Sequence, residues 1–200
     1  MYFVLFLITA SALVISLVRE IVKRGQDSIG VLLWKYFSYY TTLSNILVLI
    51  WFAALTFWPQ FSVGQFAQNP NVATAITFYI VTVGIANYLI YGWLNLSLFE
   101  RISDLLVHAV TPLLALFNWL FFVEKAQLQY SQLGYWLIFP LSYAAYTMSH
   151  GKWTHFYPYE FTNVQSLGLN KVLLNALALS ISLLIGGALF IFLGKTLARF

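Results

Sequence analysis

Six long apolar stretches constrain this chain more than any other feature of its sequence. A helix needs about 20 largely apolar residues to cross the hydrocarbon core of a bilayer, because it rises about 1.5 Å per residue. The stretches run near residues 2–18, 37–58, 72–92, 103–123, 133–150 and 171–193. Charged residues, prolines or amide side chains interrupt the chain between them. The sequence therefore predicts an all-α, polytopic membrane protein, a six-transmembrane-helix bundle that forms one domain over residues 1–200.

The composition excludes several other classes of protein. Charged residues make up 8% of the chain and hydrophobic residues 61%, whereas soluble globular domains carry about a quarter charged residues. The net charge of +4 is spread along the sequence, so there is no basic patch of the kind that binds nucleic acid. The chain has no cysteine, which excludes disulfides and thiol catalysis. No motif has the spacing of a metal or cofactor site, so we expect neither, and membrane lipids as the main partners.

The basic residues predict how the spans are oriented, because cytoplasmic loops carry an excess of Lys and Arg. Seven of the ten fall in the first, third and fifth loops: Arg19, Lys23, Arg24, Lys35, Arg101, Lys152 and Lys171. The remaining three are Lys125, Lys195 and Arg199. We therefore expect a multi-pass protein of the cell membrane with these loops in the cytoplasm and both termini exterior. Residues 2–18 lack a basic start and a cleavage site, so they are expected to stay as the first span.

Two of the expected spans carry their polar residues on one face. At 100° per residue, the polar side chains of each span fall within an arc of about 100°. On the second span these are Ser38, Thr41, Thr42 and Asn45, and on the fourth they are Arg101, Asp104, His108, Thr111 and Asn118. Because polar groups in hydrocarbon face a partner helix or a wet cavity, the two stripes predict a polar interior.

Thr41 and His108 are expected at the same depth in the membrane. Both spans enter from the cytoplasmic side, and each residue lies about five positions, or roughly 8 Å, inside. Pro112 lacks the N–H that would bond the carbonyl of His108 four residues earlier, which predicts a distortion of the helix there. A hydroxyl and an imidazole beside a distorted turn form a candidate site.

The residues alone leave simpler interpretations open. Membrane threonines commonly donate to the carbonyl four residues earlier and have no chemical role. A histidine such as His108 often serves as a contact between helices, and Asp104 and His108 at i, i+4 can be a structural pair. A polar interior also suits a non-enzymatic protein that binds or transports a lipid or a small solute.

Three segments together resemble a known family. They are FSYYTTLSN at residues 37–45, DLLVHAVTPLLALFNW at residues 104–119 and WTHFYPY at residues 153–159. In this order on a six-span chain they resemble the Pr6Pr family of bacterial integral membrane proteins, which implies a bacterial plasma membrane. That family is distantly similar to the animal androgen-induced and androgen-dependent membrane proteins, which are threonine hydrolases of fatty-acid esters of hydroxy fatty acids.

The resemblance implies a catalytic pair for this chain. The nucleophilic threonine of the animal proteins aligns with Thr41 and their histidine with His108. An alignment on Lys35 places Ser38 at the threonine position instead, one turn away on the same face. Tyr157 also matches. The implied activity is that of an integral-membrane threonine hydrolase that cleaves a lipid ester, such as a fatty-acid ester of a hydroxy fatty acid, with this lipophilic ester as its substrate.

The implied roles agree with the chemistry of the side chains. A neutral His108 would accept the proton of the Thr41 hydroxyl as the hydroxyl attacks an ester carbonyl. Asp104 would fix the tautomer of His108, and Asn45 or Arg101 would donate to the developing oxyanion. This arrangement requires the Thr41 hydroxyl and a ring nitrogen of His108 to lie near hydrogen-bonding distance.

Overall fold

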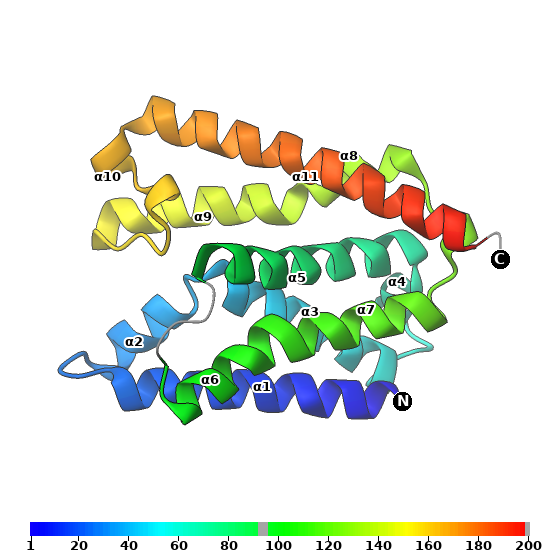
Figure 1. Cartoon of the computed structure of the whole chain (residues 1–200), viewed down its shortest axis with the longest axis horizontal. Helices are drawn as coiled ribbons and strands as arrows, with labels where there is room; N and C mark the ends of the chain where they lie inside the picture. The colour runs from blue at the N-terminus through cyan, green and yellow to red at the C-terminus, as the bar shows by residue number, and fades with distance from the viewer. Residues whose placement is uncertain (92–95, 199–200) are drawn as a thin grey trace. The chain divides into compact units, whose positions relative to one another are not determined.

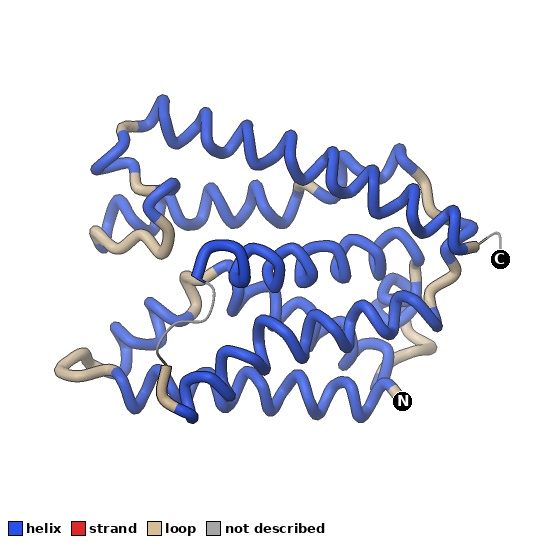
Figure 2. Tube along the Cα trace, in the orientation of Figure 1, coloured by secondary structure: helices blue, strands red, loops and turns tan. Residues whose placement is uncertain are grey.

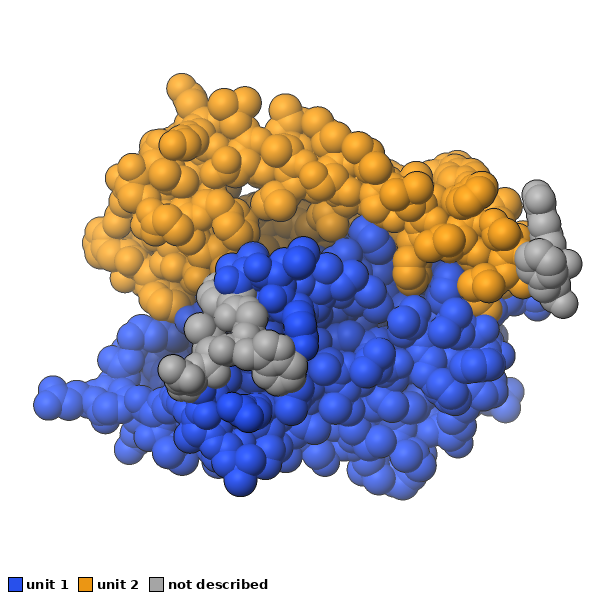
Figure 3. Space-filling model, viewed as in Figure 1, with its two compact units in different colours: residues 1–124 blue, residues 125–200 orange. Residues whose placement is uncertain are grey.

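All regular secondary structure in the described part of the chain is helical, as the apolar stretches predict (Figure 2). The computed structural model describes residues 1–91 and 96–198. Five of its helices are long and apolar enough to cross a membrane. They run over Tyr2–Lys23, Tyr40–Phe57, Pro70–Ile90, Leu98–Phe122 and Leu169–Leu197. Contacts within the chain divide it into two compact units, Met1–Glu124 and Lys125–Phe200 (Figure 3).

Unit 1 contains four of the long helices. They are α1 (Tyr2–Lys23), α3 (Tyr40–Phe57), α5 (Pro70–Tyr91) and a continuous helix made of α6 (Leu98–Leu105), the π-helical turn η1 (Leu106–Val110) and α7 (Thr111–Phe122) (Figure 1). Two short helices, α2 (Ile29–Tyr36) and α4 (Ser62–Gln68), lie in the connections. Helix α3 packs between α1 and α5, and α5 packs on α7. The candidate residues of the second and fourth spans therefore belong to one bundle.

The centre of unit 1 is closely packed and apolar. Val48 and Phe52 of α3, Ile80 of α5 and Ala115 of α7 are fully buried. A small residue such as Ala115 allows membrane helices to approach closely, which is where their packing energy comes from. The opposite faces of the helices expose large apolar side chains, for example Leu89 at 81%. This distribution suits helices whose outer surface meets lipid.

Unit 2 is built around two long helices that lie side by side, α9 (Ile138–Thr154) and α11 (Leu169–Leu197) (Figure 1). The short elements of this unit are η2 (Lys125–Gln127), η3 (Tyr130–Gln132), α8 (Leu133–Trp136), η4 (Glu160–Thr162) and α10 (Val164–Leu167). Near one end of α11, the Lys195 ammonium donates to the Leu128 carbonyl at 2.8 Å. Toward the other end, the Asn175 amide donates to the Phe161 carbonyl at 2.9 Å.

The observed helices differ from the expected spans at several ends. The span expected over 37–58 begins at Tyr40, because α2 ends at Tyr36 and a turn follows. The span expected over 103–123 begins at Leu98, because Ser97 and Glu100 form a capping box at that end. The last residue of the range 72–92 lies outside the described residues. These shifts move Arg101 from a loop into a helix.

The range 133–150 is not one continuous helix. It corresponds to α8 and to most of α9, with Leu137 between them. Helix α9 has 17 residues and several polar side chains on its inner turns, among them the buried Thr147 and His150. It is therefore shorter and more polar than the five helices named above, and the count of six spans does not follow from the helices alone.

Gly64 provides a test of how tightly α4 is held. The Trp51 indole N–H donates to the Ala67 carbonyl at 2.9 Å, which draws α4 against α3. A Cβ at Gly64 would overlap the carbonyl oxygen of Trp58, so the backbone would have to move.

We expect Gly64→Ala to destabilise the protein by about 1–3 kcal/mol, as overpacking of a closed site does. Thermal unfolding in detergent, followed by intrinsic fluorescence, measures this. Gly30→Ala is the matched control, because a Cβ there meets only the Ser28 hydroxyl at 4.0 Å. Equal melting temperatures for the two variants would contradict the prediction.

Candidate functional site

Thr41 is placed differently from most buried threonines of unit 1. Thr9 and Thr77 donate their hydroxyl protons to carbonyls four residues earlier in their own helices, at 2.9 and 2.8 Å. Thr41 lies in the first turn of α3, so the residue four positions earlier, Phe37, precedes the helix. Its hydroxyl instead faces a ring nitrogen of His108 at 3.3 Å. The simple back-bonding interpretation therefore does not describe Thr41.

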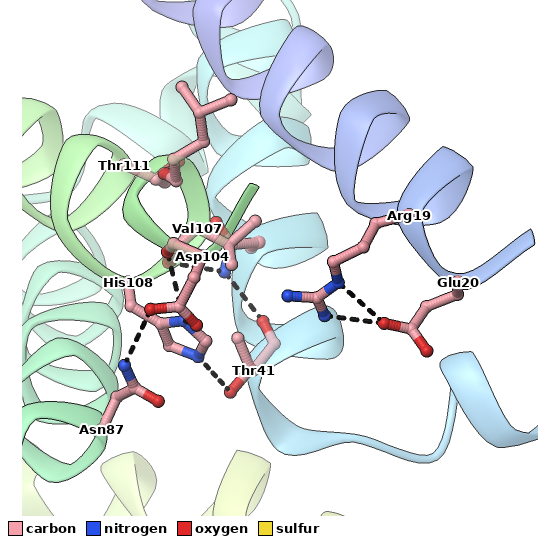
Figure 4. A network of polar contacts seen from close by, with 10 residues as sticks. Arg19, Glu20, Thr41, Asn87, Asp104, Val107, His108 and Thr111 are labelled. Atoms are coloured by element: carbon pink, nitrogen blue, oxygen red, sulfur yellow. Dashed lines mark hydrogen bonds and ion pairs between the residues drawn. The ribbon is translucent and has the colours of Figure 1, made fainter. Parts of the chain in front are cut away.

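Asp104, His108 and Thr41 form a chain of polar contacts between two helices (Figure 4). The Nδ1 atom of His108 lies 2.9 Å from the Asp104 carboxylate oxygen Oδ1 and 3.2 Å from the Asp104 backbone carbonyl. The Nε2 atom lies 3.3 Å from the Thr41 hydroxyl oxygen. The distance expected from the sequence is confirmed.

The contacts define the tautomer of a neutral His108. Both groups near Nδ1 are oxygens that accept hydrogen bonds, so the ring proton belongs on Nδ1. Nε2 then carries a lone pair and accepts the hydroxyl proton of Thr41. This is the orientation that a general base requires toward a nucleophile.

A π-helical turn presents His108 to Thr41. Residues Leu106–Val110 form this turn directly before α7, where Pro112 cannot donate a backbone hydrogen bond. The Thr111 N–H donates to the Leu106 carbonyl, five residues earlier, and the Thr111 hydroxyl donates to the same carbonyl at 3.1 Å. Such turns inside α-helices are frequent at functional sites. The distortion expected at Pro112 thus takes the form of a wider turn.

Two residues that the sequence analysis missed contribute to the surroundings of Asp104. The Asn87 amide of α5 donates to the Asp104 oxygen Oδ2 at 3.4 Å. The Arg19 guanidinium of α1 interacts electrostatically with Asp104 and pairs with Glu20 at 2.7 Å (Figure 4). Asn87 is an isolated amide in an otherwise apolar stretch, and that signal alone marks it as a candidate polar contact. The sequence alone places Arg19 in a loop, because the apolar stretch ends before it. Helix α1 continues beyond that stretch to Lys23.

The remaining predicted site residues have other surroundings. The Asn45 amide donates to the carbonyls of Thr41 at 2.9 Å and Val107 at 3.2 Å. Ser38 precedes α3, and its hydroxyl donates to the Trp34 carbonyl at 2.7 Å.

Arg101 and Tyr157 also have other surroundings. The side chain of Arg101 is exposed. Tyr157 belongs to unit 2, where its ring lies so close to Gly151 that a Cβ there would overlap it. Of the predicted residues, the structure brings Thr41, Asp104 and His108 into direct contact. Asn45 is connected to them through its hydrogen bonds to backbone carbonyls.

A carboxylate, an imidazole and a hydroxyl in contact in this order have the arrangement that proton transfer requires. In the described parts of the chain, no group of three or more His, Cys, Asp or Glu residues is arranged to hold a metal ion.

Comparison with known protein families, with characterised proteins and with solved structures finds no match. The geometry of the carboxylate, the imidazole and the hydroxyl therefore carries the functional argument.

The tautomer of His108 is directly measurable. We expect the ¹⁵N spectrum of histidine-labelled protein to show neutral His108 protonated at Nδ1, because the Oδ1 atom and the backbone carbonyl oxygen of Asp104 face that atom. Asp104→Leu removes the carboxylate and should raise the share of the Nε2-protonated form. The chain has three histidines, so His108→Ala assigns the signal. A neutral His108 protonated mainly at Nε2 in the parent protein would contradict the assignment.

Proposed function

We propose that this protein is an integral-membrane threonine hydrolase of lipid esters, such as a fatty-acid ester of a hydroxy fatty acid. The supporting observation is the hydroxyl of Thr41 held 3.3 Å from Nε2 of His108, while Asp104 occupies the other ring nitrogen. A purely structural Asp–His pair needs no hydroxyl opposite its second nitrogen. The resemblance of three segments to the Pr6Pr family supports the same chemistry.

Acyl transfer begins at Thr41 in this proposal. His108 Nε2 takes the hydroxyl proton as Oγ1 attacks the carbonyl carbon of the ester. Asp104 stabilises the imidazolium that forms, as the acid of a catalytic triad does. The tetrahedral intermediate then collapses, the bond to the alcohol oxygen breaks, and Nε2 returns the proton to that oxygen. The hydroxy acid leaves, and the acyl group remains on Thr41.

Water completes the cycle. His108 accepts a proton from a water molecule that attacks the acyl-threonine carbonyl. The bond between the carbonyl carbon and Oγ1 of Thr41 then breaks, Nε2 of His108 returns the proton to Oγ1, and the free fatty acid leaves. His108 is 15% exposed and Asp104 29% exposed in their side chains, so the site is not sealed. Negative charge on the intermediate forms at the first turn of α3, where the helix dipole favours an anion.

The proposed site also requires a definite membrane arrangement. We infer six spans, with the fifth along the chain formed by α8 and α9 together, which cover residues 133–154. A helical stretch of that length, about 1.5 Å per residue, crosses a hydrocarbon core of about 30 Å, and α9 lies beside the long apolar α11. The cell membrane, specifically a bacterial plasma membrane with both termini exterior, follows from the basic loops and from the family resemblance.

Substitutions at the three residues test the activity. We expect Thr41→Ala and His108→Ala to lower hydrolysis of a palmitate ester of hydroxystearic acid by about 10³-fold or more. Asp104→Asn should cause a smaller loss, because the base remains, and Thr41→Ser should retain activity. Purified protein in detergent is assayed by release of the hydroxy acid, with melting temperatures measured in parallel. An alkyl fluorophosphonate should label the parent but not Thr41→Ala.

Ser38→Ala is the matched control for the nucleophile. Its hydroxyl is bonded to a backbone carbonyl, so we expect activity within about twofold of the parent. Loss of activity in Ser38→Ala with full activity in Thr41→Ala would shift the nucleophile by one turn. Lipid binding without turnover in the parent would favour the non-enzymatic binding or transport protein instead.

Single cysteines test the membrane arrangement, since the chain contains none. We expect Lys23→Cys and Lys152→Cys to be protected from a membrane-impermeant maleimide in intact cells, because each lies in the last turn of a helix whose end is expected on the cytoplasmic side. Gln60→Cys, in an exterior loop, should react. Labelling of Lys152→Cys from outside would contradict the proposed orientation of the fifth span.

A further inference from the structure

The Val107 carbonyl lies at a point where the helix cannot supply a backbone donor. Its ordinary α-helical partner is the Thr111 N–H, which donates to the Leu106 carbonyl instead. Its partner in a continued π-helix would be the N–H of Pro112, which does not exist. Val107 is 3% exposed, and a buried carbonyl without a donor is costly, above all in a membrane. A donor from outside the helix is therefore needed.

Asn45 supplies this donor from α3. Its side-chain Nδ2 lies 3.2 Å from the Val107 carbonyl oxygen and 2.9 Å from the Thr41 carbonyl oxygen. The side chain is fully buried, so neither bond competes with water. One amide group thus connects the backbone of the proposed nucleophile, Thr41, to the residue directly before the proposed base, His108.

Gly84 of α5 supports the same turn from another direction. A Cβ at Gly84 would lie 2.6 Å from the His108 carbonyl oxygen and 3.3 Å from Cγ of Pro112. Only glycine allows α5 to approach the turn this closely without a shift. The π-helical turn therefore accepts a hydrogen bond from Asn45 of α3, and the backbone of α5 packs against it at Gly84.

We propose that Asn45 is a positioning residue that sets the distance between Thr41 Oγ1 and His108 Nε2 by bonding the backbone on both sides of this contact. The inference rests on the proposed hydrolase function and adds to it a role that differs from oxyanion stabilisation. Both hydrogens of the amide face backbone carbonyls, so Asn45 acts through Thr41 and His108 and not on the substrate. Misplacement of reacting groups by about 1 Å can cost about a hundredfold in rate.

Asn45→Leu tests the role with little change in side-chain volume. The leucine cannot bond either carbonyl, so the contact between Thr41 and His108 should loosen. We expect kcat for the palmitate ester of hydroxystearic acid to fall at least about tenfold, with KM within about twofold, because substrate contacts are unaltered. A readout of the contact itself accompanies the kinetics.

That readout is the ¹⁵N shift of His108 Nε2 in histidine-labelled protein. Thr41→Ala removes the hydroxyl and should change this shift in the parent. In the Asn45→Leu background the same substitution should change it by less than half as much, because the two groups are already separated. A double-mutant comparison of this kind isolates the coupling between the two sites.

Ser44→Ala is the matched control. Ser44 is the neighbour of Asn45 on α3 and is equally buried, with a hydroxyl oxygen that has no hydrogen-bond partner. Its substitution should leave kcat and the His108 shift unchanged. If Asn45→Leu fails to fold, Gly84→Ala replaces it, since the added methyl would displace the turn from the side of α5, and the same loss of coupling is expected.

The two hypotheses fail in different ways. If the parent protein does not hydrolyse esters, the proposed function is wrong, and the shift measurement alone decides the role of Asn45. If Thr41→Ala changes the His108 shift equally with and without Asn45, the positioning role is wrong, whatever happens to kcat. Unchanged kcat in a folded Asn45→Leu protein would also overturn it.

Discussion

Every backbone carbonyl in apolar surroundings needs a hydrogen-bond donor. This requirement dominates the structure around the candidate site. Pro112 removes one N–H from the helix that runs over Leu98–Phe122, and the chain responds with a π-helical turn at Leu106–Val110. That turn carries His108 and leaves the Val107 carbonyl to be bonded by Asn45. The π-helical turn that carries the imidazole and the carbonyl that the buried amide bonds thus both lie beside one missing donor.

The other half of the site depends on where a helix begins. Because α3 starts at Tyr40, Thr41 falls in its first turn and is released from the local bond that occupies Thr9 and Thr77. Its hydroxyl is then available to the His108 ring. The proposed nucleophile therefore also lies at the helix end that favours negative charge. Packing of α3 in the bundle of unit 1 brings the start of this helix and the π-helical turn together in one site.

Much of this arrangement was predictable from periodicity. Thr41 and Asn45 repeat at four residues, as do Asp104 and His108, so each pair shares a helix face whatever the exact ends of the helix. The matching depth of Thr41 and His108 was expected from spans that begin near residues 37 and 103, but the helices begin at Tyr40 and Leu98, so the packing of the helices decides this contact. The role of Asn45 was not predictable, because it depends on a carbonyl of another helix that lies 62 residues away in the sequence. Arg19 was missed because α1 continues past its apolar stretch to Lys23.

The sequence by itself determined that the protein is helical and membrane-embedded, because apolar stretches of spanning length leave no other way to satisfy the backbone. It also determined which residues share a face of each helix. Only the tertiary structure decided which faces meet, because contacts such as Thr41–His108 and Asn45–Val107 depend on the packing and relative height of separate helices. The tautomer of His108 was decided there too, since it depends on which oxygens lie opposite each ring nitrogen.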